Sequence, residues 1–493
     1  MKRWSLMLCL AALLALPVAA YAAELVPAAA AAPRTAIVTL DRTPLRAAPR
    51  ESAQLHASLW AGDSLEVRGV RLDYLQVYDH RRERAGFVRA NRVRVVDLQE
   101  AAAPELRAVL RFLRDSPGDE ALGIGYAAAF LRAAPAVMID AEVFDALGVM
   151  ADRLARRASA NRQRGLDEAL AAQVEVAVQH GVRMLSYEHE GRMQLCYEGE
   201  AFRRVLALPS NAEQKARAAL ALTRHECVDP DLPPLARFEL DEWRAQVLER
   251  MVPADLPEHW RNRLHLRAAG VWSSIAFARS RRGGDAQQAA ERALQEFAAV
   301  DRQQLAEEDA AAYEETAIRV GASRWAAVDA LPAAKGLSIR SVAGQAPGET
   351  CAQLIDDKRA APLLQRCTFG TAWTPSVRVN PQASIVTLAV QPLSSWRELW
   401  VFQRNENGWR VDVVPPGVDR PELGYLEFAG WVPGKPKLLV AREIKREGRC
   451  LRSFEILDLR TLKVDKQAAD PSHLSLFYRW QDPAWKRQTV ALR

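Results

Sequence analysis

The sequence has few cysteines, no long apolar run beyond its first two dozen residues, and no large excess of charge of either sign. Six of its 493 residues are cysteine, and basic residues exceed acidic ones only enough to give a formal net charge of +6. Charges of both signs are interspersed, which is typical of a solvated surface and not of a nucleic-acid footprint. Nucleic acid is therefore excluded as the main partner. Stable membrane insertion is not expected once the first apolar run is removed.

Motifs that would identify an enzyme are also missing. The chain has no Gly-x-Ser-x-Gly elbow, no phosphate-cradling glycine loop and no Cys-x-x-Cys pair. His189 and His225 each begin a His-Glu pair that lacks the second histidine of a zinc protease. We therefore predict a protein that is not an enzyme and has no cofactor and no metal.

Two alternatives to that prediction stay open. An unrecognised envelope hydrolase would need a cluster of histidine, carboxylate or cysteine, and only the group of His180, His189, His225 and Cys196 is dense enough in the sequence. A zinc site would use Cys196, Cys227, His189 and His225.

The first 22 residues have the features of a signal peptide. Lys2 and Arg3 precede the apolar run "LMLCLAALLALPVAA", and Ala20-Tyr21-Ala22 offers small residues for cleavage. The mature protein is expected to be periplasmic or secreted, a setting in which disulfides form.

Five cysteines remain after residue 22, so two disulfides and one remaining thiol are expected. Fifteen arrangements are consistent with the sequence. We favour the pairs nearest in sequence, which are Cys196–Cys227 and Cys351–Cys367, leaving Cys450.

The chain divides by composition and periodicity into five segments. After the signal peptide (1–22) comes an Ala/Pro linker (23–34), and residues 35–98 alternate with the period of strands. Residues 99–335 follow the helical period and are rich in alanine, with a strand-like hairpin near 183–199. Residues 336–493 return to strand-like runs.

Within the first strand-rich segment, residues 37–96 resemble a bacterial SH3-like (SH3b) domain. "LRAAP" (45–49) is similar to that family's arginine-bearing turn, and "LWAGDSLEV" (59–67) to its next hairpin. "YLQVYD" (74–79) and "AGFVRANRV" (85–93) are similar to the two following strands. The resemblance implies a small β-barrel that engages a cell-wall or protein ligand.

The candidate ligand-binding residues of this module are aromatic or basic. Trp60 is expected either to pack against a neighbouring domain or to form a ligand platform, and Tyr74 and Phe87 to lie in the barrel core. The basic residues surround one hairpin and form either a solvated loop or a patch for an anionic glycan or acidic protein. The full set is Trp60, Arg71, Tyr74, His80, Arg81, Arg82, Arg84 and Phe87.

The C-terminal segment contains two similar hairpin units, "NPQASIVTLAVQ" onward and "WVPGKPKLLVA" onward. They weakly resemble blades of a β-propeller, but two blades cannot close one. The sheets are expected either to form a sandwich or, preferably, to dock on the helices. The fold class is therefore multidomain α+β, made of an SH3-like β-barrel, an alanine-rich α-helical domain and a C-terminal antiparallel β-sheet domain with blade-like hairpins.

Two functions follow from this organisation. In the first, an exported envelope protein binds peptidoglycan or an envelope protein through its SH3-like module. In the second, the module packs internally and the chain is a structural or assembly scaffold. Burial of Trp60 and of the Arg81–Arg84 loop against the helices would favour the second. The sequence does not fix the ligand, the partner, the oligomeric state or the fate of Cys450.

Overall fold

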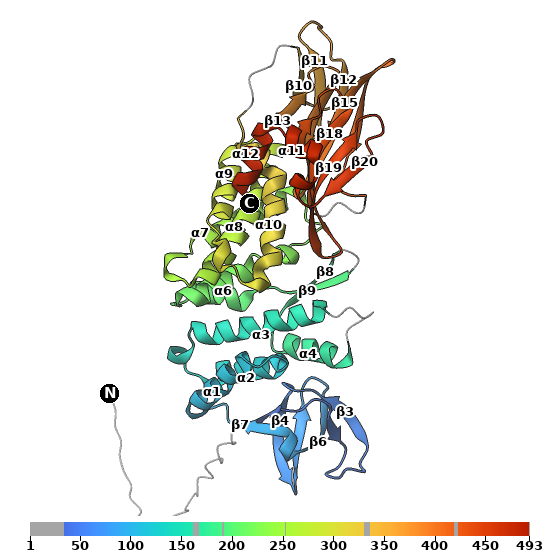
Figure 1. Ribbon diagram of the computed structural model, residues 1–493. Helices are drawn as coiled ribbons and strands as arrows, with labels where there is room; N and C mark the ends of the chain where they lie inside the picture. Colours follow the sequence, from blue (N-terminus) through green and yellow to red (C-terminus); the bar gives the residue numbers. More distant parts are fainter. Residues whose placement is uncertain are drawn as a thin grey trace, which may run out of the picture.

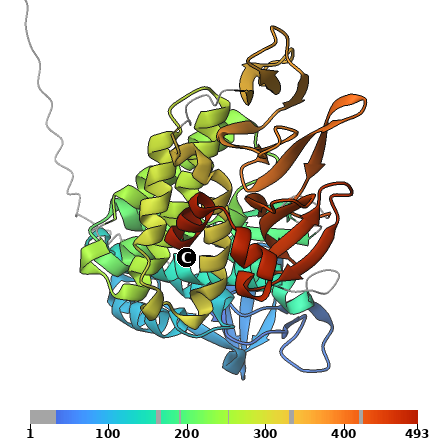
Figure 2. The same cartoon turned by 45° about the horizontal axis from the view of Figure 1, so that its top comes forward.

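The computed structural model describes residues 34–160, 167–189, 192–251, 253–329, 336–418 and 423–492. The predicted signal peptide and almost all of the predicted linker lie outside these ranges. Figure 1 shows a blue N-terminal sheet below a stack of helices, with orange and red sheets beside the upper helices. Figure 2 shows the same C-terminal sheets flanking the yellow helix α10 from a second direction. The molecule is a mixed α and β chain with several separate sheets, as the coarse fold class predicts.

The N-terminal sheet has seven antiparallel strands in the order β3-β2-β6-β5-β4-β1-β7. The strands are β1 (Arg34–Val38), β2 (Thr43–Arg46), β3 (Leu55–Leu59), β4 (Ser64–Arg71), β5 (Tyr74–Asp79), β6 (Arg84–Arg89) and β7 (Val93–Val96). The expected closed barrel is not formed, because the two edge strands of the described sheet, β3 and β7, do not pair with each other. The sheet is also weakly joined between β2 and β6, which pair only at Arg46 and Phe87.

The interior of this sheet follows the alternation along β5. Leu75 and Val77 lie in the buried cluster with Val88 of β6 and Leu45 of β2. Tyr74 is buried, at 4% exposure, and Phe87 is half-buried; neither belongs to that cluster, because both occupy the alternate positions of their strands.

Ten α-helices form the middle of the described chain. They are α1 (Ala103–Arg114), α2 (Glu120–Ala133), α3 (Ala141–Ala160), α4 (Glu168–Gln179), α5 (Glu200–Ala207), α6 (Ala212–Leu222), α7 (Pro234–Glu249), α8 (Glu258–Arg281), α9 (Gln287–Ala298) and α10 (Ala310–Ser323). In α1 the buried residues Leu106, Leu110 and Leu113 recur at helical spacing. The start of α6 is fixed by a capping box in which Asn211 and Gln214 bond each other's backbone N–H.

A short hairpin interrupts the helices where the sequence predicts one. It consists of β8 (Met184–His189) and β9 (Arg192–Tyr197), and its turn, Glu190-Gly191, lies outside the described residues. The predicted disulfide Cys196–Cys227 is confirmed and ties β9 to the one-turn 3₁₀ helix η4 (His225–Cys227).

The C-terminal segment forms a three-stranded and an eight-stranded sheet. The small sheet contains β10 (Leu337–Ala343), β11 (Thr350–Asp356) and β12 (Leu364–Thr368). The large sheet contains β13 (Thr371–Val379), β14 (Ile385–Leu393), β15 (Trp396–Asn405), β16 (Gly408–Val414), β17 (Gly424–Trp431), β18 (Lys437–Arg446), β19 (Arg449–Asp458) and β20 (Val464–Ala468). The two blade-like units are therefore not separate blades, because β15 and β17 pair in parallel and join them.

The sheets dock on the helices, the arrangement preferred from sequence, and the two blade-like units do not face each other as a sandwich because they belong to one sheet. Leu337 and Leu354 of the small sheet share a core with Val386 of the large sheet, while Leu423 and Tyr425 pack on Ile318 and nearby residues of α10. Two C-terminal helices, α11 (Ser475–Trp480) and α12 (Pro483–Leu492), close the chain, and their Phe477 and Trp485 pack on the large sheet.

The helix-to-sheet contact also contains buried charge. Arg324, which follows α10, and Arg397 of β15 both meet Glu427 of β17, and Arg397 Nη1 donates to the Gly321 carbonyl at 2.6 Å. These ion pairs and the hydrogen bond to Gly321 offset part of the desolvation cost of the buried charges and link the large sheet to the end of α10. Within the described ranges, none of the helices combines the length and apolar content that a membrane crossing requires.

Candidate functional site

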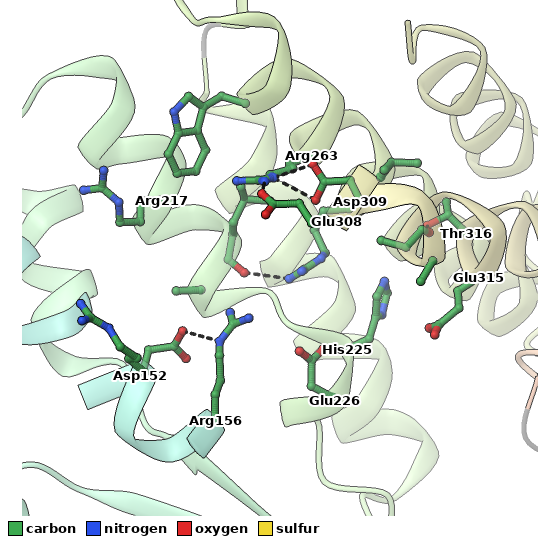
Figure 3. Close-up of a pocket in the computed structure, with 18 of the residues that line it drawn as sticks. Asp152, Arg156, Arg217, His225, Glu226, Arg263, Glu308, Asp309, Glu315 and Thr316 are labelled. Carbon is green, nitrogen blue, oxygen red and sulfur yellow. Dashed lines mark hydrogen bonds and ion pairs between the residues drawn. The ribbon is translucent and has the colours of Figure 1, made fainter. Parts of the chain in front are cut away.

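A large charged cavity lies where α3, α6, α8 and α10 converge on η4. Its volume is about 920 Å³, and Lys445 of β18 reaches it from the large sheet. Figure 3 shows His225 and Glu226 on one turn and Glu315 and Thr316 on α10. The cavity is of the size that protein ligand sites have.

Cations outnumber carboxylates on the cavity wall. Seven lining side chains are arginine or lysine and five are aspartate or glutamate. Most of the cations are paired: Arg263 binds Asp309 at 2.8 Å and Glu308, and Lys445 binds Glu315 at 3.0 Å. Figure 3 marks the contacts of Arg263 with Asp309 and of Arg156 with Asp152.

Two of the arginines have no carboxylate partner. Arg267 donates to the Leu220 carbonyl at 2.7 Å, but no described carboxylate lies within ion-pair distance of it. The same holds for Arg319, which has no hydrogen-bond partner for its guanidinium among the described residues. Burial lowers the pKa of Arg319, and that of Arg267 to about 10, so both remain charged at neutral pH. The cavity therefore holds two cations without a counter-charge in contact.

His225 lies beside these arginines as a hydrogen-bond donor. Its Nδ1 accepts a hydrogen bond from Arg244 at 3.0 Å, so Nε2 must carry the proton in the neutral ring. Nε2 is buried and has no hydrogen-bond partner within the described part of the chain. A methyl group placed on Gly270 would lie 2.5 Å from this nitrogen and 3.6 Å from Arg319 Cδ, so both groups flank the same point of α8.

The electrostatic surroundings keep His225 neutral. Burial, followed by the charges of Arg244, Arg319, Arg267 and Arg237, lowers the pKa of His225 well below its usual range. A neutral imidazole with its lone pair engaged by a guanidinium cannot accept a proton from a substrate, so the ring is suited to binding and not to general base catalysis.

The adjacent carboxylate is equally unsuited to proton transfer. Burial opposes ionisation of Glu226, but Arg224 and Arg267 lower its pKa to about 2. Its Oε1 receives a hydrogen bond from Arg224 at 2.9 Å. Glu226 is therefore a permanent anion that neutralises part of the wall.

The confirmed disulfide positions the two functional residues of η4. Cys227 ends the turn that begins with His225, and its bond to Cys196 holds the turn against β9. The disulfide thus explains why a one-turn helix in a connecting segment can present a fixed donor.

A second hollow of about 740 Å³ continues from the cavity, sharing His225, Arg319 and Lys445 with it. One wall comes from α7 and α8 and the other from the end of β14 and the loop that follows it. Leu235 and Leu393 on its rim are 54% and 46% exposed, which is high for apolar side chains. We call this hollow the α8 groove.

Trp60, the predicted aromatic candidate, is buried and not a free platform. It is 7% exposed and packs against Ala121 of α2 and against Ala172 and Val176 of α4. The backbone around it is equally close-fitting. Gly62 has φ +96°, and a methyl group there would lie 2.4 Å from the Ala121 carbonyl oxygen. The sheet therefore contacts the helices through a closely packed junction.

The predicted basic loop is also engaged. Arg81 forms an ion pair with Glu175 of α4, and Arg82 pairs with Asp79 at 2.6 Å. Asp63 lies within 3.8 Å of Arg81 and 3.4 Å of Arg82. These arginines are neutralised within the molecule.

The remaining candidates are scattered. His80 and Arg84 are exposed, His80 lying 2.6 Å from Glu66 and Arg84 donating to the His56 carbonyl at 3.4 Å. Arg71 is exposed at the end of β4, Tyr74 is 4% exposed beneath Arg89, and Phe87 is half-buried on β6. The structure does not bring these residues together with Trp60 into one surface.

His180 and His225, two members of the group that the hydrolase alternative would use, lie in different parts of the molecule. His180 donates to the Gly62 carbonyl at 2.9 Å, at the junction with the N-terminal sheet, whereas His225 lies in the cavity. Cys196 and Cys227 are bonded to each other, which removes the thiolates that the alternative zinc site requires. The side chain of His189 is outside the described part of the structure.

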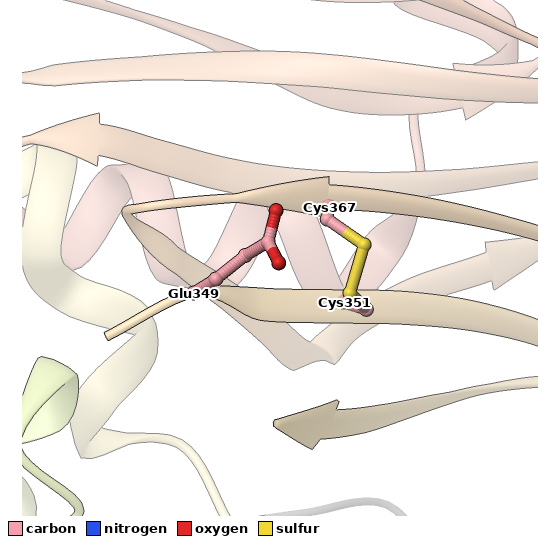
Figure 4. Close-up of side chains that lie close together, drawn as sticks. All are labelled: Glu349, Cys351 and Cys367. Atoms are coloured by element: carbon pink, nitrogen blue, oxygen red, sulfur yellow. A yellow bond between two sulfur atoms is a disulfide. The ribbon is translucent and has the colours of Figure 1, made fainter. Parts of the chain in front are cut away.

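A second set of possible metal ligands also contains two cysteines that are bonded to each other. Glu349 lies beside Cys351 and Cys367, as Figure 4 shows, and these two sulfurs form the second predicted disulfide. A disulfide sulfur is not a thiolate ligand, so this set is a cross-strand link between β11 and β12. Cys450 lies outside both disulfides, as expected.

No family model matches the chain, and no curated protein or solved structure is significantly similar to it. The site must therefore be interpreted from its own geometry. Sequence reasoning marked His225 as a residue to check but missed Arg267 and Arg319, which follow ordinary helical patterns in α8 and α10.

Proposed function

We propose that the chain is an exported, non-enzymatic binding protein of the cell envelope, which holds an anionic ligand in the arginine-lined cavity. The single observation that carries the proposal is the placement of Arg267, Arg319 and the Nε2–H of His225 on one cavity wall without a carboxylate in contact with them. Arg267 and Arg319 are half-buried, and charges partly removed from water are normally paired, so two cations without a described carboxylate in contact fit a site completed by an anionic ligand.

Binding is favoured over catalysis because the ionisable groups at the centre are fixed in one protonation state. The hydrogen bond from Arg244 occupies the lone pair of His225, and Glu226 stays ionised beside Arg224. Acid–base catalysis requires groups that exchange protons near the working pH.

We further propose that the N-terminal SH3-like sheet is a structural part of this protein. Of the two functions expected from sequence, internal packing is supported by the buried Trp60 and by the Arg81–Glu175 ion pair. Export to the periplasm or beyond is supported by the two disulfides. Carboxylate-bearing peptidoglycan and acidic envelope proteins are the partners with the required charge.

The test is calorimetric titration of the purified protein with inorganic phosphate and with succinate, against sodium chloride at equal ionic strength. We expect saturable binding of at least one dianion, weakened about tenfold by Arg319→Gln or Arg267→Gln, which corresponds to one charge-assisted contact of about 1.4 kcal/mol. The matched control is Arg359→Gln, which changes an exposed arginine of the small sheet region.

Failure of both dianions to bind would overturn the proposal. Equal weakening by Arg359→Gln would also overturn it, because the effect would then be one of overall charge and not of this cavity.

A further inference from the structure

The α8 groove has a cation at each end and apolar side chains between them. At one end of the groove, His225 and Arg319 lie beside Gly270 of α8. At the other end, Arg281 is the last residue of α8 and Arg282 follows it. Eleven residues separate Gly270 from Arg281, so at 1.5 Å per residue the two ends are roughly 16 Å apart.

The far cations are available to a ligand. Arg282 is exposed, and its guanidinium carbon lies 4.7 Å from the centroid of the Phe238 ring. Arg281 lies beside Phe277 with its Nε buried and without a partner. No described carboxylate lies within ion-pair distance of either arginine. Stacking on an aromatic ring holds a guanidinium in place while its N–H groups remain free to bind a carboxylate.

The stretch between the two ends has apolar side chains on both walls, beside the Arg237–Asp241 ion pair of α7. Leu235 and Phe238 contribute from α7, Phe277 from α8, and Leu393 from the end of β14 opposite. Exposed leucines on facing rims fit a ligand that places apolar side chains along the groove and covers them.

We propose that the α8 groove binds an extended segment of a partner protein, with carboxylates about 16 Å apart and apolar side chains between them. At about 3.3 Å per residue, roughly five residues of extended chain separate two such carboxylates. The inference rests on the proposed anion site, which supplies the first cationic end.

The charge pattern distinguishes this occupant from an amphiphilic lipid. A fatty acid presents one anion and one apolar tail, so it would leave either Arg319 or the Arg281–Arg282 end without a counter-charge. A peptide with separated acidic residues neutralises both ends, and charge pairing of this kind sets register in peptide grooves.

The experiment uses three labelled peptides, acetylated and amidated, in fluorescence anisotropy with the full protein. The first is Asp-Leu-Phe-Leu-Ala-Asp, the second is the rearranged Asp-Asp-Leu-Phe-Leu-Ala, and the third replaces both aspartates by asparagine. We expect the first peptide to bind at least tenfold more tightly than either of the others.

Variants separate the groove from the anion site. Leu393→Asp and Arg282→Gln should each weaken the first peptide at least fivefold while leaving phosphate or succinate affinity within twofold. Both positions are exposed at the rim, so the fold is not expected to change. The control is Val137→Asp, an apolar residue that is 91% exposed and outside the groove.

The outcomes distinguish the two proposals. Equal affinity for the first and second peptides, with dianion binding retained, would overturn the groove inference alone. Peptide binding unaffected by Arg319→Gln would overturn the anion site as its anchor. Tighter binding of laurate than of the first peptide, or displacement of that peptide by purified peptidoglycan sacculi, would assign the groove to another ligand and overturn the inference.

Discussion

Two arginine-rich regions of the molecule differ in whether the protein supplies their counter-charges. At the junction of the N-terminal sheet with α4, Arg81 and Arg82 meet Glu175, Asp79 and Asp63. In the cavity between α8 and α10, Arg267 donates to a carbonyl and a hydroxyl group, and neither Arg267 nor Arg319 has a carboxylate partner among the residues that the structure describes. A high local content of arginine therefore does not by itself indicate a binding surface. Arginines without a carboxylate partner indicate one, because their charge is left for a ligand to neutralise.

The comparison also separates two kinds of aromatic contact. Trp60 fills a gap between sheet and helices, whereas Phe238 and Phe277 lie in a groove whose opposite wall includes an exposed leucine. Side chains of the same protein cover Trp60, whereas the groove beside Phe238 and Phe277 leaves room for a ligand. Four predictions test this contrast, beginning with the one that should have the largest effect.

Trp60→Ala should lower the free energy that holds the N-terminal sheet on α2 and α4 by about 3–5 kcal/mol, the usual cost of deleting a buried aromatic side chain. Hydrogen exchange of the α4 amides measures this, because it reports local opening. Leu72→Ala, at a position 88% exposed in the same sheet, is the control and should change it by less than about 0.5 kcal/mol. An effect of Trp60→Ala as small as the control would mean that Trp60 is not the packing anchor.

Replacing both Cys196 and Cys227 by serine should lower stability by about 2–4 kcal/mol, since the link closes a loop of 31 residues. It should also weaken dianion binding, because η4 would no longer be held against β9. The matched control is the Cys351 and Cys367 pair, whose removal should cost a similar amount of unfolding free energy and leave dianion affinity unchanged. Denaturant unfolding and calorimetry measure the two effects, and equal dianion affinity in both double variants would contradict the assigned role of η4.

Stability should fall as the pH drops below about 6.5, and His225 should be one cause. Its folded pKa lies below the unfolded value of about 6.5, so the unfolded chain takes up a proton that the folded chain does not. The contribution is complete near pH 7.5 and should decrease by up to about 1.4 kcal/mol on reaching pH 5.5. Above pH 5 the contribution of Glu226 is constant, because it is lost only between about 4.5 and 2.

His225→Gln should flatten this part of the stability curve, measured by urea unfolding at pH 7.5, 6.5 and 5.5. His80→Gln is the control, since His80 is exposed on the N-terminal sheet. An unchanged slope in His225→Gln would show that the ring takes up its proton as readily in the folded as in the unfolded chain, and would contradict its role as a neutral donor.

The sequence predicts much of what depends on near neighbours. Alternation and helical spacing place the strand-rich and helix-rich segments, and proximity in the chain suffices for both disulfide pairs. For Trp60 the sequence predicts part of the outcome. Its residue type predicts a contact, but whether the ring packs on the helices or is exposed to a ligand depends on where α2 and α4 lie.

The cavity could not be predicted because its parts come from distant segments. Arg319 occupies a helical position like its neighbours in α10, and nothing local distinguishes it from Arg81. The difference arises in tertiary structure: Glu175, 94 residues beyond Arg81, forms an ion pair with it, whereas no carboxylate in the described ranges lies within ion-pair distance of Arg319. The prediction of a closed barrel was wrong for a related reason, since closure depends on pairing between the two edge strands of the sheet.

The smallest effects give the sharpest contrast, because one substitution should have opposite signs in the two regions. Arg319→Met removes a half-buried cation that no described carboxylate contacts, and it should raise stability by up to about 1 kcal/mol while weakening dianion binding. Arg81→Met breaks an ion pair whose glutamate is largely exposed and should lower stability by no more than about 1 kcal/mol without affecting binding. Urea unfolding and calorimetry of both variants measure these changes. If Arg319→Met instead destabilised the protein as Arg81→Met does, Arg319 would have a partner within the folded chain. The cavity would then be as closed as the junction, and an anion would have no cation left to bind.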